Sequence, residues 1–273
     1  MEEYLKRIAD ALERAFPLDP DTAFFEKADA FIWEPDRNHF SEVTSISTID
    51  ISLLKGMDKE IERVRLNTKA FADGNLANNV LVWGARGMGK STLIKSVVKS
   101  TSSKNNSLKI IEVARDDIGQ MNILLKIIKN IDKKFIIFCD DISFDDNETS
   151  YKSLKSLLDG GLIGGAQNFL IYATSNRRHL LSRKTSNNSD FMRWEEELDE
   201  RLSISDRFGI SIGFYECDQN LYLEIVRSYA NSFGLNITTK ELDKKAIEWQ
   251  MQRGSRSGRV ARQFIISLLN SHT

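Results

Sequence analysis

The sequence GARGMGKS at residues 84–91 decides how the rest of the chain is interpreted. It fits the pattern G-x-x-x-x-G-K-[ST], and it lies between a mostly apolar run at residues 79–83 and an amphipathic segment from about Lys90 to Lys99. Glycines let the backbone turn tightly with its N–H groups facing inward, and the start of the following helix adds partial positive charge. This strand–loop–helix unit predicts a site that holds phosphate groups.

Each residue type in this loop suits the binding of a nucleoside triphosphate. The Lys90 ammonium should reach the β- and γ-phosphates, and the Ser91 hydroxyl should ligate Mg²⁺. We expect no separate role for Arg86, because a loop arginine is normally solvated. A glycine-rich turn that only begins a core helix is the competing interpretation, and the flanking strand and helix weigh against it. The nucleotide-binding residues expected here are Gly84, Ala85, Arg86, Gly87, Met88, Gly89, Lys90, Ser91 and Thr92.

Short apolar segments alternate with amphipathic ones along most of the chain. The expected strands lie at residues 79–83, 108–113, 135–139, 168–174 and 210–214, and the expected helices at 57–73, 90–99, 117–130 and 150–159. Polar loops are expected at 100–107 and 182–190, and residues 195–205 have a helical pattern. Strands alternating with helices predict an α/β fold, a three-layer parallel sheet with helices on both faces. Helical periodicity from about residue 219 onward predicts a small C-terminal helical lid.

Residues 1–52 differ from the rest of the chain and are expected to form an N-terminal accessory region. Residues 2–16 have the spacing of an amphipathic helix, and all three prolines of the chain lie within the first 35 residues. Residues 24–33 include a dense set of aromatic and aliphatic side chains that must be buried against another part of the protein. The expected division is an accessory region at 1–52, an α/β nucleotide-binding domain at 53–215 and a helical lid domain at 216–273.

The composition is that of a soluble globular protein. Of the 273 residues, 41% are hydrophobic and 28% are charged. The 38 Lys and Arg residues nearly balance the 39 Asp and Glu residues, so the formal net charge of −1 gives no overall attraction to nucleic acid or to an anionic membrane. Two cysteines, Cys139 and Cys217, are too few for a disulfide framework, and no apolar run approaches the roughly 20 residues of a membrane helix. We expect a cytoplasmic protein with no membrane insertion.

Two carboxylates follow the apolar run at residues 135–139. In a parallel sheet the carboxyl ends of the strands face the ligand crevice, so we expect Asp140 to hold Mg²⁺ and Asp141 to face the attacking water. A solvated strand end that caps the next turn is the alternative, and the phosphate loop about fifty residues upstream makes it the weaker one. Asn176 follows the next expected strand, where its amide could orient that water, although an asparagine in a turn is the simpler interpretation on its own.

The order of these motifs resembles the AAA+ ATPase module. The phosphate loop at residues 84–91 comes first, then the acids at 140–141, then Asn176. Residues 198–210 (LDERLSISDRFGI) resemble the segment of that family that ends in an arginine followed by Phe. Residues 254–264 (GSRSGRVARQF) resemble the sensor 2 helix in the helical lid.

Several strings resemble more narrowly one bacterial family of uncharacterised AAA+ ATPases, catalogued as domain of unknown function 815. They are NNVLVWGARGMGKSTLIK, FCDDISF, LLDGGL, IYATSNRRHL and SDRFGI. The resemblance covers about residues 53–273 and implies no cellular role. It also implies that Gly56 and Met57, just before the core, line the adenine pocket.

The resemblance assigns roles to the residues near the phosphates. Lys90 and Ser91 match the Walker A lysine and hydroxyl, and Asp140 matches the Walker B carboxylate that holds Mg²⁺. Asp141 stands where most members have the catalytic Glu, which is one methylene longer. Asn176 matches sensor 1.

Two arginines complete the set that the resemblance implies. Arg207 matches the arginine finger that acts on the ATP of a neighbouring subunit, with Arg201 as its competitor for that role. Arg259 matches sensor 2, which touches the γ-phosphate from the lid of the same subunit. Arg256 and Arg262, three residues to either side, compete with it because they share a nearby helix face.

These roles imply an ATPase that uses ATP and Mg²⁺ in a homo-oligomer, with Arg207 acting in trans on a neighbour and the assembly acting on a protein or nucleic-acid partner. A nucleotide-dependent scaffold with little turnover is an alternative, because Asp141 is short. A small-molecule P-loop kinase is a weaker one, because the chain continues into a sensor 2-like helix.

The basic stretch at 253–262 could contact phosphates. For Arg177-Arg178-His179 a solvated loop is the simpler interpretation.

Overall fold

The computed structural model describes residues 3–7, 20–142, 149–159, 168–176 and 204–271. Residues 3–7 are helical, as the N-terminal periodicity predicts. Other predictions lie outside the described residues. They concern the rest of the first helix up to residue 16, the loop at 182–190, most of the segment at 195–205, and Arg177, Arg178, His179 and Arg201.

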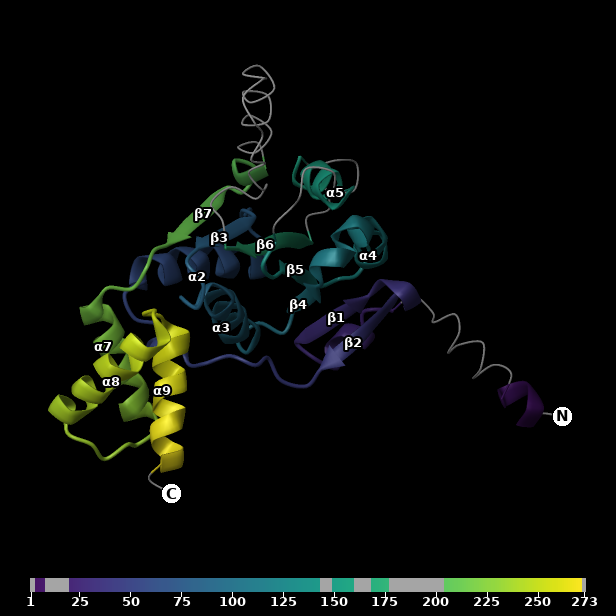
Figure 1. The fold of residues 1–273 in the computed structure, drawn as a ribbon. Helices are drawn as coiled ribbons and strands as arrows, with labels where there is room; N and C mark the ends of the chain where they lie inside the picture. Colours follow the sequence, from purple (N-terminus) through teal and green to yellow (C-terminus); the bar gives the residue numbers. More distant parts are fainter. Residues whose placement is uncertain (1–2, 8–19, 143–148, 160–167, 177–203, 272–273) are drawn as a thin grey trace, which may run out of the picture.

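A seven-stranded sheet forms the middle of the described structure (Figure 1). Its order is β2-β1-β4-β5-β6-β3-β7, and every neighbouring pair is parallel except β1 with β2. The predicted α/β fold with a parallel sheet is therefore confirmed. The strands are β1 (Ala30–Glu34), β2 (His39–Val43), β3 (Val80–Gly84), β4 (Leu108–Val113), β5 (Lys134–Cys139), β6 (Phe169–Ser175) and β7 (Ile210–Phe214).

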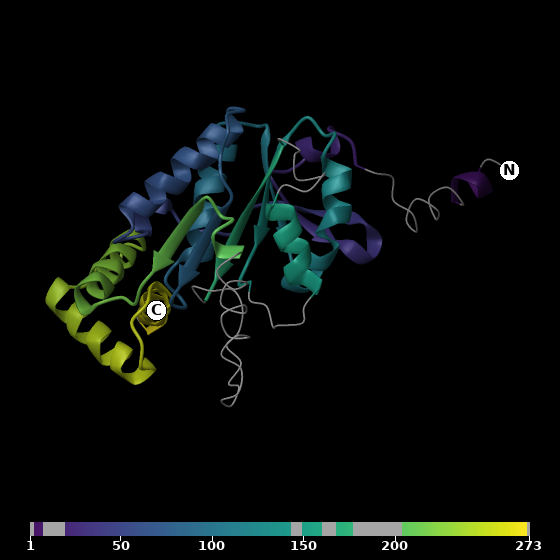
Figure 2. The same ribbon diagram turned by 90° about the horizontal axis from the view of Figure 1, so that it is seen from above.

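Helices cover both faces of this sheet (Figure 2). The helices are α2 (Asp58–Ala72) and α3 (Lys90–Ser102) on one face, and α4 (Met121–Ile128) and α5 (Thr149–Leu158) on the other. Strand β5 shows why the sheet needs both layers: Ile136 and Phe138 enter the core under α2 and α3, while Phe135, Ile137 and Cys139 enter the core under α4 and α5. All five side chains are fully buried, as the continuous apolar run predicts.

The N-terminal region contributes two strands that the sequence did not predict. Strands β1 and β2 extend the sheet beyond β4, and Phe31 and Trp33 enter the same core as α4 and α5. Phe25, Phe31 and Trp33 of the dense apolar set are buried, as expected. Ile32, between Phe31 and Trp33, points the other way and is 43% exposed, which departs from that expectation. Because Phe-Ile-Trp is a continuous apolar run, the alternation that marks a strand is hidden in the sequence.

Two helix predictions differ from the structure in detail. The segment predicted as one helix at 117–130 begins as a 3₁₀ helix, η4 (Arg115–Gln120), before α4 starts. Gly119 lies in this part, and glycine disfavours the α-helical backbone. Helix α3 continues to Ser102 and so takes up the start of the predicted loop at 100–107.

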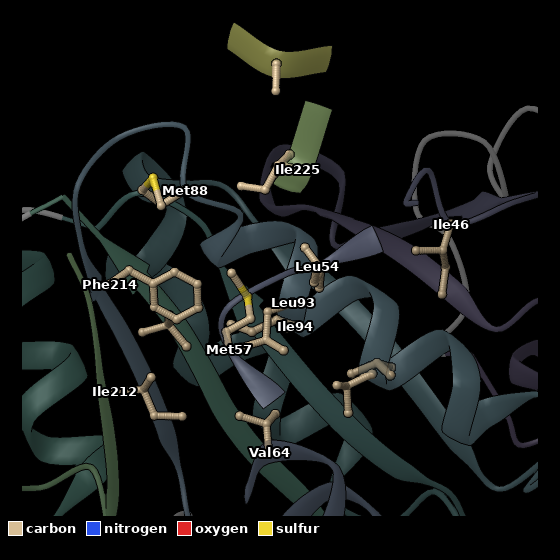
Figure 3. Close-up of a cluster of buried hydrophobic side chains, with 14 of the residues drawn as sticks. Ile46, Leu54, Met57, Val64, Met88, Leu93, Ile94, Ile212, Phe214 and Ile225 are labelled. Carbon is tan, nitrogen blue, oxygen red and sulfur yellow. The ribbon is translucent and has the colours of Figure 1, made fainter. Parts of the chain in front are cut away.

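Three helices follow the last strand and pack together: α7 (Gln219–Ser232), α8 (Thr239–Arg253) and α9 (Gly258–Ser271). Asp218 caps α7 by accepting from the Leu221 N–H at 2.8 Å, and Gly254 ends α8 in a left-handed conformation. Their apolar side chains join the core under α2 and α3. Figure 3 shows Ile225 of α7 beside the cluster that includes Leu54 and Met57. None of the described helices is long and apolar enough to cross a membrane.

Gly84 joins β3 to the loop that follows in a conformation that only glycine adopts readily. Its φ is +128°, and a Cβ placed on it would lie 1.9 Å from the carbonyl oxygen of Phe214 on the neighbouring strand β7. The same oxygen accepts a hydrogen bond from the Ala85 N–H at 2.9 Å. The close approach of these two strands therefore fixes where the loop begins.

Replacing Gly84 with alanine should destabilise the protein by roughly 3 kcal/mol or more, because strained backbone and forced overpacking each cost about 1–3 kcal/mol. Gly74→Ala is the matched control. Gly74 also has a positive φ, of +85°, but a Cβ there would meet nothing within 4 Å. Urea unfolding should therefore show the smaller loss for Gly74→Ala. Equal losses in the two variants would contradict the contact with Phe214 as the cause.

Candidate nucleotide-binding site

The strand order brings the predicted motifs to one edge of the sheet. Strand β6 lies between β5 and β3, and all three are parallel, so their carboxyl ends are neighbours. The phosphate loop follows β3, the two acids follow β5, and Asn176 follows β6. Three segments that are far apart in the sequence therefore meet where the crevice of an open parallel sheet is expected.

A cavity of about 710 Å³ lies at this edge. Three groups of described residues line it: the phosphate loop with the adjacent strand ends, a segment before α2, and the C-terminal helices. From the loop and strand ends come Arg86, Gly87, Met88, Gly89, Lys90, Ser91, Thr92, Asp140, Asp141, Thr174 and Asn176. A volume of this size suits a cofactor or nucleotide.

Lys90 places a buried positive charge in this cavity. The residue is only 7% exposed, and its Nζ donates to the carbonyl oxygens of Gly84 and Ala85 and to Asn176 Oδ1, each at 2.9 Å. Burial lowers the pKa of the Lys90 ammonium, and the nearby Asp141 and Asp140 oppose that shift. A desolvated cation of this kind gains most from an anionic ligand.

Ser91 and Asp140 form an oxygen-only pair beside this lysine. The Ser91 hydroxyl donates to Asp140 Oδ1 at 2.5 Å. Hydroxyl and carboxylate oxygens suit Mg²⁺, which is usually held by one or two carboxylates together with phosphate oxygens. Among the described residues no cluster of three or more His, Cys, Asp or Glu side chains forms an all-protein metal cage. The residues present therefore fit a metal that arrives with a phosphate ligand.

Asp141 adopts a left-handed backbone conformation, with a φ of +50°. Its Oδ1 accepts a hydrogen bond from Asn176 Nδ2, and its N–H donates to the Thr174 hydroxyl at 2.8 Å. Asp141 and Asn176, each predicted to act on the attacking water, are therefore in contact. Thr174 was given no role from the sequence, although a hydroxyl two residues before Asn176 at a strand end was the available signal.

The C-terminal helices reach the phosphate loop directly. The Arg259 N–H, in the first turn of α9, donates to the Gly87 carbonyl at 3.1 Å. The three arginines that compete for the sensor 2 role differ in position. Arg259 and Arg262 both line the cavity, whereas Arg256 donates to Gln250 at 3.0 Å and is not among the described lining residues.

Part of the cavity wall is apolar. Ile49, Leu53, Leu54 and Met57 line it from the segment before α2, and Ile225 and Tyr229 line it from α7. Met57, which the resemblance predicts to line the adenine pocket, is among these residues. Gly56 packs against Leu221 of α7 and, like Gly84 and Ala85, is not among the described lining residues. The lining residues at 47–55 carry no motif and were not predicted from the sequence.

Arg207 does not line this cavity within its own chain. Its Nε forms an ion pair with Asp159 Oδ1 just beyond α5, and its side chain is 26% exposed. Its backbone N–H donates to the Ile204 carbonyl at 3.1 Å. The structure therefore separates Arg207 from the Lys90 site of the same subunit.

Comparison with solved structures shows the type of fold. The chain aligns with the Aeropyrum pernix ORC1 protein solved in complex with DNA, at 14% identity and a TM-score of 0.52, over 78% of this chain and 61% of that one. It aligns with a point mutant of Thermotoga maritima RuvB at 18% identity and a TM-score of 0.51, over 75% of this chain and 60% of that one. The likeness shows that this chain has the fold of these AAA+ proteins.

Sequence comparison places the chain in a family. No curated protein matches it. A family model described as "Protein of unknown function (DUF815)" matches residues 26–272. The match begins before β1, so it takes in the two N-terminal strands that the sequence resemblance, which starts at about residue 53, leaves out. On this match over most of its length, the chain belongs to the DUF815 family, with the fold of an AAA+ ATPase.

Proposed function

We propose that the protein binds ATP with Mg²⁺ and hydrolyses it to ADP and phosphate in an assembly of its own copies. The observation that carries this proposal is the position of Lys90. Its buried ammonium lines the same cavity as Ser91, Asp140 and Asp141. A buried cation beside oxygen ligands for Mg²⁺ is complementary to a polyphosphate.

The reaction needs mainly positioning and charge neutralisation, and the residues of the cavity supply both. Lys90 and the loop amides bind the β- and γ-phosphates. Ser91 and Asp140 would hold Mg²⁺, which when bound neutralises phosphate charge. Asp141 takes the proton of the attacking water, and Asn176 helps to orient that water.

The apolar part of the cavity wall suggests how the whole nucleotide lies. Since the phosphates belong at Lys90, we place the base against the apolar side chains of Met57, Ile225 and Tyr229. In our division of the chain, residues 216–273 are a lid domain, 53–215 the nucleotide-binding domain and 1–52 an accessory region. Closure of the lid on the nucleotide then couples hydrolysis to motion.

Arg207 supports the assembly part of the proposal. It lies away from the cavity of its own subunit, so a role in hydrolysis requires that it enter the site of a neighbour. We propose that the assembly uses ATP to remodel or switch a macromolecular partner, a protein or a nucleic acid. DNA is bound in the ORC1 structure that this chain resembles in fold.

The proposal is tested by phosphate release measured over a series of protein concentrations, with Mg²⁺ and with EDTA. The rate per subunit should rise with protein concentration and vanish in EDTA. Tight ATP binding without turnover at any concentration would favour the scaffold instead, for which the short Asp141 is the argument. Phosphate transfer to a small acceptor, without dependence on protein concentration, would favour a kinase.

Arg259→Ala should weaken ATP binding by roughly tenfold to a hundredfold and ADP binding much less. A guanidinium on the γ-phosphate makes charge-assisted hydrogen bonds of about 1.5–3 kcal/mol, and ADP has no γ-phosphate. Calorimetric titration of both nucleotides measures the difference.

Arg256→Ala is the matched control for this prediction, because Arg256 lies on the other side of Gly258 and contacts Gln250 instead of the cavity. It should bind both nucleotides as the unmodified protein does. A selective loss of ATP affinity in Arg262→Ala with none in Arg259→Ala would assign the sensor 2 role to Arg262.

A further inference from the structure

Thr174 contacts both acids of the site through one buried hydroxyl. The residue lies near the carboxyl end of β6 and is 1% exposed. Its Oγ1 donates to Asp140 Oδ1 at 2.5 Å and accepts from the Asp141 N–H at 2.8 Å, and its carbonyl accepts from the Ile142 N–H at 2.8 Å. A threonine hydroxyl has a single proton to donate, so these two bonds fix its direction.

The first of these bonds holds the carboxylate that we assign to Mg²⁺. Asp140 Oδ1 accepts from Thr174 on one side and from Ser91 on the other. Mg²⁺ tolerates little deviation from octahedral geometry, so the direction of a ligating carboxylate matters. Partners that orient metal ligands typically contribute 10- to 100-fold to metal affinity or activity.

The second bond holds the backbone of the residue that we assign to the attacking water. The left-handed conformation of Asp141 is unfavourable for a residue with a Cβ unless its surroundings hold it. Thr174 holds two consecutive N–H groups of this turn, those of Asp141 and Ile142. The turn therefore takes its shape from β6, the strand that also carries Asn176.

We propose that Thr174 is a positioning residue that aligns the Mg²⁺ carboxylate and the water-activating carboxylate with each other. The proposal rests on the function proposed above, since it needs both acids to act on the same bound nucleotide. The hydroxyl donates to Asp140 and accepts from the backbone N–H of Asp141, so it can keep both bonds only while the two residues stay in fixed relative positions. A shift of either residue would strain the hydrogen bond to the other.

The test compares Thr174→Val, which keeps the shape and loses the hydroxyl, with Thr174→Ser, which keeps the hydroxyl. ADP affinity is measured by calorimetry with Mg²⁺ and with EDTA, alongside steady-state hydrolysis. In Thr174→Val, affinity with Mg²⁺ and the turnover number should each fall about 10- to 100-fold, while affinity in EDTA stays unchanged. Thr174→Ser should restore both to within a few-fold of the unmodified protein.

Thr101→Val is the matched control for losing a buried hydroxyl. Thr101 lies in α3 away from the cavity, and its hydroxyl donates to the Val97 carbonyl at 2.9 Å. This variant should bind and hydrolyse nucleotide normally. If Thr174→Val does not fold, Thr174→Ala takes its place in the same comparison.

Two results would overturn the inference in distinguishable ways. Equal losses of affinity with Mg²⁺ and with EDTA, or normal behaviour of Thr174→Val while Lys90→Ala is inactive, would leave the proposed function in place and remove the role of Thr174. Failure of the unmodified protein to bind Mg²⁺–ADP would remove the proposed function itself, and the role of Thr174 with it.

Discussion

Lys90→Ala is expected to lower ATP affinity at least about 100-fold and to remove hydrolysis. The ammonium is the buried cation of the cavity, and its loss deletes charge-assisted hydrogen bonds to two phosphates at about 1.5–3 kcal/mol each. Titration of ATP by calorimetry and a phosphate-release assay measure the two effects.

A second lysine of the same helix provides the control. Lys95 pairs with Glu112 on β4 at 3.1 Å and is not among the described residues that line the cavity. Lys95→Ala should therefore bind ATP normally. Circular dichroism of both variants confirms that they fold. Retention of ATP affinity in a folded Lys90→Ala would contradict the assignment of this cavity to a polyphosphate.

Arg207→Ala should lower hydrolysis about 10³-fold while leaving ATP affinity unchanged. An arginine finger supplied by a neighbouring subunit contributes about 10³–10⁵ to the rate, and Arg207 makes no part of the cavity of its own subunit. Hydrolysis should also stop rising with protein concentration. Arg227→Ala, which removes an arginine paired with Asp243 on the C-terminal helices, should hydrolyse normally.

Mixing two inactive proteins tests whether Arg207 acts in trans. Arg207→Ala subunits keep an intact cavity, and Lys90→Ala subunits keep an intact finger, so their mixture should regain part of the activity. No recovery from a mixture that assembles would contradict action across an interface. If Arg201→Ala shows the loss and Arg207→Ala does not, the finger is Arg201.

The sequence predicted the parts of the site whose shape depends on neighbouring residues. The phosphate loop needs only the strand before it, its glycines and the helix after it, so β3, the loop and the start of α3 at Lys90 were predicted closely. The strand at 108–113 was predicted at both ends, because a buried strand between polar residues has a clear pattern. Both acids and Asn176 were found because each directly follows such a strand.

Contacts between distant residues could not be predicted in this way. The bond from Thr174 to Asp140 spans 34 positions, and no periodicity records it. Which of Arg256, Arg259 and Arg262 line the cavity depends on the path of the chain after Gly254, and their spacing on a helix does not reveal it. Strands β1 and β2 were not predicted for two reasons. In β1 the exposed Ile32 is itself apolar, so the alternation of burial does not appear in the sequence, and β2, at the edge of the sheet, buries only Phe40.

The hydrogen bond from the Arg259 N–H to the Gly87 carbonyl has a thermodynamic consequence. It joins the phosphate loop to the start of α9. The free energy of binding a ligand at the loop therefore depends on the orientation of the C-terminal helices. Linkage then requires reciprocity: whatever a ligand does to the affinity of the bundle for another molecule, that molecule does equally to the affinity for the ligand. A molecule that binds α9 and shifts the bundle should therefore change the affinity of the cavity for its ligand without contacting that ligand.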